Sequence, residues 1–189
     1  MKKKLKIIFL IINIFLFQGC KVISKNIQWQ NIETIRKNKQ ELETGDILIL
    51  SKKIGTYTWL GHSAIYLKEY DVVAEYPQIF HGFYYVKLND WLNAVSDRKI
   101  KILRYKEINK KFKNKIFEVI ENNKNKRYKV VLNKKNNNGF YCSQWVWYIF
   151  YKTGIEFNKN IDLDSDGGPI VYPYDFLYSN KLYKVHIGK

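Results

Sequence analysis

The sequence predicts a single α+β domain, and three observations support this fold class. The chain of 189 residues has the length of one ordinary domain. Its content of 46% hydrophobic and 16% aromatic residues is enough for a packed core, which excludes a disordered or low-complexity protein. Apolar segments of strand length lie mainly in the first half of the chain, segments of helical character flank them, and no internal repeat is present.

The strands are predicted from short apolar runs bounded by turn residues. Gly45 and Asp46 open the first run, and a charged turn at residues 68–71 separates the second run from the third, which is typical of a β-hairpin. The predicted strands are residues 47–50, 62–67, 72–76, 84–88 and 99–103.

Three segments have the composition of helices. Residues 31–43 contain neither Gly nor Pro and include two isoleucines three positions apart, which predicts a short helix. Residues 140–153 are strongly apolar and precede Gly154, so we expect a buried helix that this glycine caps. In residues 107–122, lysines fill one face and apolar side chains the other, namely Ile108, Phe112, Ile116, Val119 and Ile120.

The N-terminus has the features of a secretory signal. Lysines precede an apolar run at residues 7–17 that is too short to span a bilayer comfortably. Gly19 and Cys20 follow, and a small residue before Cys resembles the bacterial lipoprotein signal, in which this Cys becomes the lipidated first residue. The alternatives are an uncleaved anchor and an unmodified thiol.

This interpretation divides the chain into three parts. Residues 1–19 are the expected signal peptide, residues 20–43 a lipidated tether with a short helix, and residues 44–189 the folded domain. Cleavage leaves 189 − 19 = 170 residues with 29 Lys+Arg and 17 Asp+Glu, a net charge of +12. Acylation plus a basic surface provides two membrane-binding signals. We therefore expect an exported lipoprotein of the cell envelope, anchored to a bacterial membrane.

The composition excludes several other classes of protein. The full chain has 33 Lys+Arg against 17 Asp+Glu, but lysine is abundant in every segment, which indicates biased composition and no nucleic-acid partner. Two cysteines cannot form a disulfide framework, and three histidines without ligand spacing do not predict a zinc site. Residues 162–167 match the first half of a calcium loop, but Pro173 occupies the twelfth position, so we expect a solvated loop, no metal and no cofactor.

Cys142 is the candidate nucleophile. It lies at the predicted start of the buried helix, where unpaired backbone N–H groups and the positive end of the helix dipole stabilise a thiolate. His62 opens a predicted strand, whereas the other histidines, His81 and His186, lie in a loop and in the C-terminal tail. Glu75 lies on the strand antiparallel to that of His62, so its carboxylate can orient the imidazole. From spacing alone, a triad and three unrelated structural residues both remain open.

Five short motifs resemble the permuted papain-like hydrolases, the YiiX/YycO-like branch of the NlpC/P60 superfamily. They occur in the order of that family and span nearly the whole mature domain: GDIL at residues 45–48, GHSAIY at 61–66, VAE at 73–75, YCSQ at 141–144 and PYDF at 173–176. The resemblance implies a circularly permuted papain-like fold, in which an antiparallel sheet packs against helices and the nucleophile begins a helix.

The resemblance also implies roles for individual residues. Cys142 corresponds to the nucleophile, His62 to the general base and acid, and Glu75 to the residue that orients His62. Tyr141 matches an aromatic residue before the nucleophile, and either substrate contact or ordinary packing explains it. The resemblance implies that Asp46 orders the first strand rather than reacting.

The expected function is that of a membrane-anchored cysteine amidase or peptidase acting on cell-wall peptides, such as those of peptidoglycan, or on amino-acid conjugates. A thiol-dependent lipid acyl hydrolase or acyltransferase is one alternative, and a non-catalytic lipoprotein that binds wall peptides is another. Tyr57 and Trp59, in a loop beside His62, are expected to contact the substrate in either enzyme.

Overall fold

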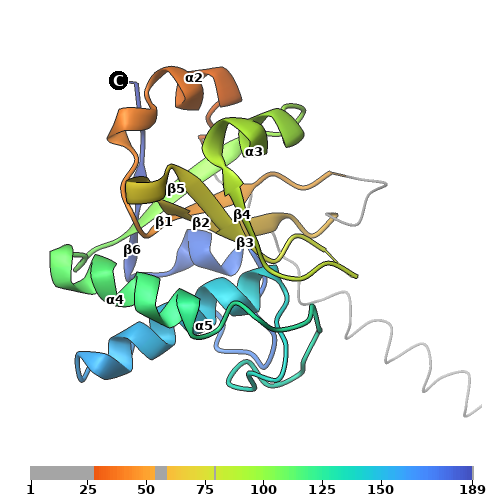
Figure 1. Ribbon diagram of the computed structural model, residues 1–189, viewed down its shortest axis with the longest axis vertical. Helices are drawn as coiled ribbons and strands as arrows, with labels where there is room; N and C mark the ends of the chain where they lie inside the picture. Colours follow the sequence, from red (N-terminus) through yellow and green to blue (C-terminus); the bar gives the residue numbers. More distant parts are fainter. Residues whose placement is uncertain (1–27, 54–58, 79, 189) are drawn as a thin grey trace, which may run out of the picture.

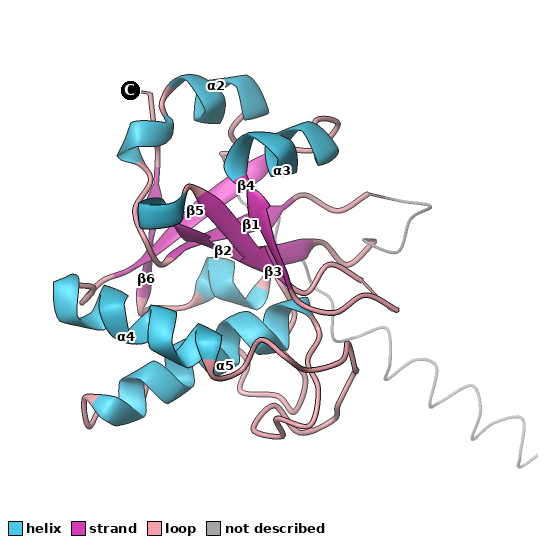
Figure 2. Ribbon diagram, in the orientation of Figure 1, coloured by secondary structure: helices cyan, strands magenta, loops and turns pink. Residues whose placement is uncertain are grey.

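The computed structural model describes residues 28–53, 59–78 and 80–188. These residues form a six-stranded sheet in the order β4-β3-β2-β1-β5-β6, and all of its strand pairs are antiparallel (Figures 1 and 2). The strands are β1 (Asp46–Leu50), β2 (His62–Leu67), β3 (Val72–Glu75), β4 (Tyr84–Lys87), β5 (Ile100–Tyr105) and β6 (Leu182–Val185).

Helices cover both faces of this sheet. One face packs against α4 (Lys110–Glu121) and α5 (Cys142–Glu156), and the other against α2 (Ile32–Lys37) and α3 (Leu88–Ala94) (Figure 1). Strand β1 therefore buries Ile47 against the first pair of helices and Leu48 against the second. Because both faces are covered, the central strands are continuous apolar runs instead of alternating ones. Within the described residues, no helix is both long and apolar enough to cross a membrane.

The five predicted strands are all present, whereas one α-helix, α3, and one strand, β6, were missed. The helix expected over residues 31–43 is shorter, because it ends at Lys37 and a 3-10 turn (Lys39–Glu41) follows. The prediction that the apolar helix ends before Gly154 was wrong, since α5 continues to Glu156. A Cβ atom at Gly154 would lie 2.7 Å from both Ile161 Cγ1 and Lys159 O, so this glycine lets the segment after α5 pack closely against the helix.

One end of the sheet gathers the loops that matter for function. Leu50 at the end of β1 pairs with His62 at the start of β2, and Glu75 at the end of β3 pairs with Tyr84 at the start of β4. Residues 51–61 and 76–83 therefore leave the sheet at the same end. We call it the His62 end.

Gly61 allows the chain to enter β2 at this end. Its φ of +93° is in the region that favours glycine, and an added Cβ would lie 2.9 Å from Cε1 of Tyr174.

Candidate active site

His62 and Glu75 form a buried hydrogen-bonded pair. The register that pairs Ile65 with Ala74 places Glu75 diagonally across from His62 on the neighbouring strand. Glu75 Oε2 lies 2.7 Å from His62 Nε2, and the indole Nε1 of Trp91 donates to the same oxygen at 3.0 Å. Two elements thus hold the carboxylate: β3 carries it, and α3 supplies a second donor. The remaining ring nitrogen of His62, Nδ1, is left for Cys142.

The Cys142 thiol and the His62 imidazole interact strongly. Burial by itself would lower the pKa of His62, but hydrogen bonds with Cys142 and Glu75, together with their negative charges, raise it to about 10. Burial raises the pKa of Cys142, yet the hydrogen bond and positive charge of His62, aided by the backbone N–H of Ser63, hold it below its ordinary value. These opposite shifts favour a thiolate–imidazolium pair.

Helix α5 adds a second source of stabilisation for negative charge. Cys142 is its first residue, and the N-cap residue Tyr141 makes no side-chain cap hydrogen bond. The first backbone N–H groups of a helix lack partners within the helix, and its N-terminus is the positive end of the dipole. These amides can stabilise both a thiolate and the oxyanion of a tetrahedral intermediate.

Side chains next to Cys142 anchor the start of α5 to two loops. The Ser143 hydroxyl donates to the backbone carbonyl of Val171 at 2.7 Å, and the backbone N–H of Val171 donates to the Tyr141 hydroxyl at 2.9 Å. The Gln144 side-chain amide donates to the backbone carbonyl of Asn136 at 2.7 Å. The nucleophile is therefore held in place on both sides. Tyr141 is buried in this network, and its contact with substrate stays a prediction.

The segment before α5 brings Tyr128 close to the sulfur. Tyr128 forms a parallel bridge with Phe140, two residues before Cys142, and the Lys129 N–H donates to the Phe140 carbonyl at 2.9 Å. Burial, followed by the nearby negative charge of Cys142, raises the pKa of the Tyr128 phenol. Gly139 makes this approach possible, because a Cβ there would lie 2.7 Å from the Cβ of Lys129.

Sequence reasoning missed Trp91 and Tyr128. Trp91 belongs to a helix that was not predicted, and Tyr128 lies fourteen residues before Cys142 in an irregular segment. No local pattern links either side chain to the catalytic candidates.

The remaining predicted site residues are placed as follows. Trp59 is exposed in the loop before β2. Tyr57 and Cys20 lie outside the described residues, so their predicted roles in substrate binding and lipidation stay predictions.

The acidic segment after α5 forms an irregular loop, as the sequence suggests, but the expectation that it is solvated was wrong in part, because Ile161, Leu163 and Asp164 are buried. One carboxylate oxygen from each of Asp164, Asp166 and Asp175 lies within 4.8 Å of the others. Lys134 is 2.7 Å from Asp164 and offsets part of the charge. Burial, then the charges of Asp166 and Asp164, raise the pKa of Asp175 to about 7.

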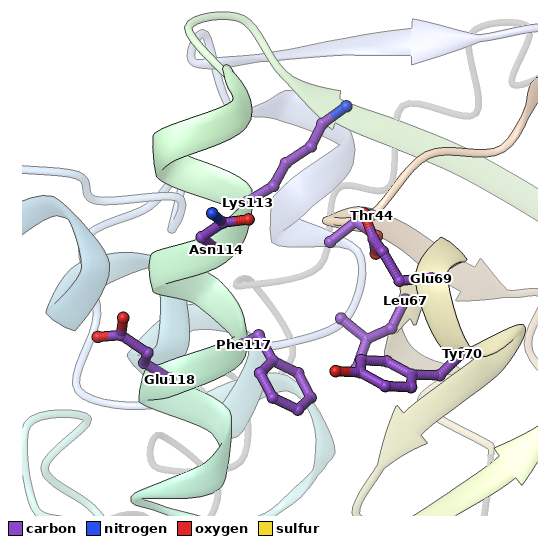
Figure 3. A pocket seen from close by; sticks show the side chains of 8 residues that line it. All are labelled: Thr44, Leu67, Glu69, Tyr70, Lys113, Asn114, Phe117 and Glu118. Atoms are coloured by element: carbon purple, nitrogen blue, oxygen red, sulfur yellow. The ribbon is translucent and has the colours of Figure 1, made fainter.

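A cavity of about 240 Å³ lies away from this site, between α4 and the far end of β2 (Figure 3). Leu67, Tyr70 and Phe117 supply its apolar wall, and the Tyr70 and Phe117 rings stack at 5.0 Å. Because Leu67 and His62 lie at opposite ends of β2, this cavity is separate from the candidate catalytic residues.

Comparison with known proteins places this geometry in context. Residues 41–186 match the family described as permuted papain-like amidase enzymes, YaeF/YiiX, C92 family. The crystal structure of the metalloprotein YiiX from Escherichia coli O157:H7 has a TM-score of 0.59 and 15% identity, covering 77% of this chain and 97% of that chain. No curated protein matches the sequence. The α+β architecture predicted from the sequence, an antiparallel sheet packed against helices, is confirmed.

Proposed function

The chain belongs to the permuted papain-like amidases and is a cysteine amidase, and from this premise we propose that Cys142, His62 and Glu75 form its catalytic triad. One observation supports this proposal above all others. A continuous chain of interactions runs from Cys142 at a helix N-terminus through His62 to Glu75, with Trp91 as a further donor to the carboxylate. Burying charged groups together costs desolvation free energy, and groups with strongly shifted pKa values concentrate at functional sites.

In the proposed mechanism, His62 holds the proton of Cys142, and the thiolate attacks the carbonyl carbon of an amide. Backbone N–H groups at the start of α5 bind the developing oxyanion. The His62 imidazolium then protonates the leaving amine as the C–N bond breaks, which leaves a thioester on Cys142. His62 next removes a proton from water, which attacks the thioester and releases the carboxylic acid and the free enzyme. Glu75 orients the ring and stabilises its protonated form throughout.

The proposed substrates are amides of cell-wall peptides or of amino-acid conjugates. The proposed location is the cell envelope, where Cys20 would carry a lipid anchor after removal of residues 1–19, and residues 44–189 would form the hydrolase domain. The order of the five sequence motifs supports assignment to the NlpC/P60 superfamily. Tyr57, Trp59 and Tyr141 are proposed substrate contacts.

Incubating the protein with peptidoglycan fragments, amino-acid amides and acyl lipids tests this proposal. We expect release of primary amine from one of the amides, and no release by the Cys142→Ala variant. Release of fatty acid alone would identify a lipid acyl hydrolase instead. Amine release that persists in Cys142→Ala would reject the triad, and binding without any product would support a wall-peptide-binding protein.

A further inference from the structure

We propose that the loops around Cys142 dock on the anionic surface of a lipid bilayer, so that the active site opens toward the membrane. This inference rests on the proposed function in taking Cys142 as the reactive residue and Cys20 as the anchor. The docking surface consists of the described residues of three loops, namely 51–53 with 59–61, 76–78 with 80–83, and 122–141, which we call the rim loops.

The rim loops lie around the same end of the sheet. Residues 51–61 and 76–83 join strands at the His62 end, and residues 122–141 lead directly into Cys142. Tyr76 ties the second and third loops together, because its hydroxyl donates to the Lys124 carbonyl at 3.0 Å and its ring lies 5.7 Å from that of Phe140. In Figure 1 the two strand-connecting loops extend from one side of the sheet, and the loop before α5 extends on that side below them.

Exposed apolar side chains concentrate on the rim loops. The four most exposed large hydrophobic residues in the described part of the chain are Phe80 at 101%, Leu132 at 74%, Trp59 at 61% and Val130 at 57%. All four belong to rim loops, and together they come from all three. Single exposed apolar residues are common on protein surfaces, but their collection around one opening indicates an interaction site.

The rim loops also have one sign of charge. Their sequence contains eight basic residues and no Asp or Glu: Lys52, Lys53, Lys124, Lys126, Arg127, Lys129, Lys134 and Lys135. Several of these contact neighbouring groups, such as Lys134 with Asp164, but Arg127 and Lys129 are exposed. Basic side chains interleaved with aromatic and aliphatic tips suit an anionic bilayer, which attracts the cations and accommodates the apolar groups.

The N-terminal tether enters the domain at this same end. Lys101 Nζ donates to the Gln28 carbonyl at 2.8 Å, and the Trp29 ring lies 5.8 Å from that of Tyr174, which covers Gly61. Gln28 lies eight positions after Cys20, so a fully extended tether between them reaches at most about 28 Å. An acyl group on Cys20 would therefore keep the His62 end, rather than the opposite end, near the bilayer.

These features favour a bilayer over a soluble acidic polymer or protein. The most exposed apolar side chains, those of Phe80, Leu132, Trp59 and Val130, come from three different loops. Separate tips can each enter a fluid interface, whereas a folded partner requires a matching surface. The predicted substrate then reaches Cys142 from the membrane surface.

Tryptophan quenching by brominated lipid tests this orientation directly in the full chain. Of the five tryptophans, Trp91, Trp145 and Trp147 are buried and Trp29 is partly buried, which leaves Trp59 as the exposed reporter. In vesicles of brominated phosphatidylcholine and phosphatidylglycerol, we expect quenching that increases with the phosphatidylglycerol fraction and decreases with salt. The Trp59→Phe variant should lose this component. Equal quenching in both proteins would overturn the proposal.

A matched pair of variants separates docking from catalysis. In the Cys20→Ser background, Phe80→Ser with Leu132→Ser should lower partition into phosphatidylglycerol vesicles by about tenfold. Tyr183→Ser with Ile155→Ser removes exposed apolar groups at the opposite end and should leave partition unchanged. Both double variants should hydrolyse a soluble amide at the parental rate.

The outcomes distinguish the two proposals. Equal vesicle partition by both double variants would reject the docking surface while leaving the amidase intact. Partition that depends on the rim loops in a protein without amide turnover would instead retain docking and reject the proposed function.

Discussion

The two ends of β1 each hold buried charges, but these charges are arranged differently. At the far end, the Arg104 guanidinium donates to both carboxylate oxygens of Asp46, at 2.6 and 2.8 Å, and to Glu43 at 2.8 Å. At the His62 end, Glu75 binds His62 through Nε2 alone, and the other side of the imidazole interacts with a half-buried sulfur.

The difference lies in how many hydrogen-bonding positions are already filled. Asp46 also accepts the Glu43 backbone N–H at 2.9 Å, and Arg104 donates to the Glu41 carbonyl at 3.0 Å, so this network is closed. The His62 end retains a nucleophilic sulfur next to a proton acceptor, and the sulfur lies at the first amides of α5, which lack partners within the helix. A closed network stabilises one structure, whereas an open one can react, which agrees with the expected ordering role of Asp46.

The largest effect is expected from removing the sulfur. Cys142→Ala should lower amide hydrolysis at least about a thousandfold, because no nucleophile remains. The midpoint of urea unfolding should fall only modestly, because His62 loses one partner but keeps Glu75, and a half-buried thiol contributes little packing. Turnover measurements and urea titrations on the same sample check both parts, and a large loss of stability would show that Cys142 has a structural role.

Breaking the hydrogen-bond network around Asp46 should have the opposite effect: it should lower stability and leave turnover nearly unchanged. Arg104→Leu leaves the Asp46 carboxylate buried without its partner and should lower the free energy of unfolding by about 3–5 kcal/mol. Turnover per folded molecule should be nearly unchanged. The double variant Arg104→Leu with Asp46→Leu is the matched control, and it should recover much of the loss in a urea titration. No recovery would mean that charge pairing is not the cause.

Glu75→Gln tests the role of charge at the His62 end. The amide keeps an acceptor for His62 but removes the negative charge that supports the imidazolium, so turnover should fall about 10- to 100-fold. The alkaline limb of the activity profile should also move to lower pH, because the pKa of His62 decreases. Unchanged activity and pH profile would exclude Glu75 from the triad.

The stability of the parent protein is expected to decrease at alkaline pH. Folding raises the pKa of His62 from 6.5 to about 10, so protonated His62 contributes stability that is fully present below pH 6.5. This stabilisation is lost as the pH rises through about 10. Alkylation of Cys142 in the Cys20→Ser background should report a reactive thiolate below the ordinary thiol pKa of 9.0. Alkylation with an unshifted midpoint would contradict the pair.

The smallest effect is expected at Trp91, which acts through Glu75. Trp91→Phe removes one donor to the carboxylate and should reduce kcat about three- to tenfold with little change in KM. The distinguishing readout is the pH profile: with less competition for its oxygen, Glu75 should raise the pKa of His62 and move the alkaline limb upward. A fall in stability alone would assign Trp91 to packing.

More of the interacting residues were predicted at the His62 end of β1 than at its far end. The candidates Cys142, His62 and Glu75 were identified from five short motifs, and the structure brings their side chains together. The partner of Asp46 was not predicted, because Arg104 lies 58 positions away and just beyond the strand predicted at residues 99–103. Helix α3 was also missed, and with it the donor Trp91.

The sequence by itself determined the α+β class, the positions of five strands and the candidates for the reactive residues. These properties depend on short-range periodicity and on the side chains themselves. Only the tertiary structure decided which charged groups have their hydrogen-bonding positions filled and which do not. It also decided that the rim loops lie at one end of the sheet. Those outcomes depend on strand order and register between distant segments, which local patterns do not encode.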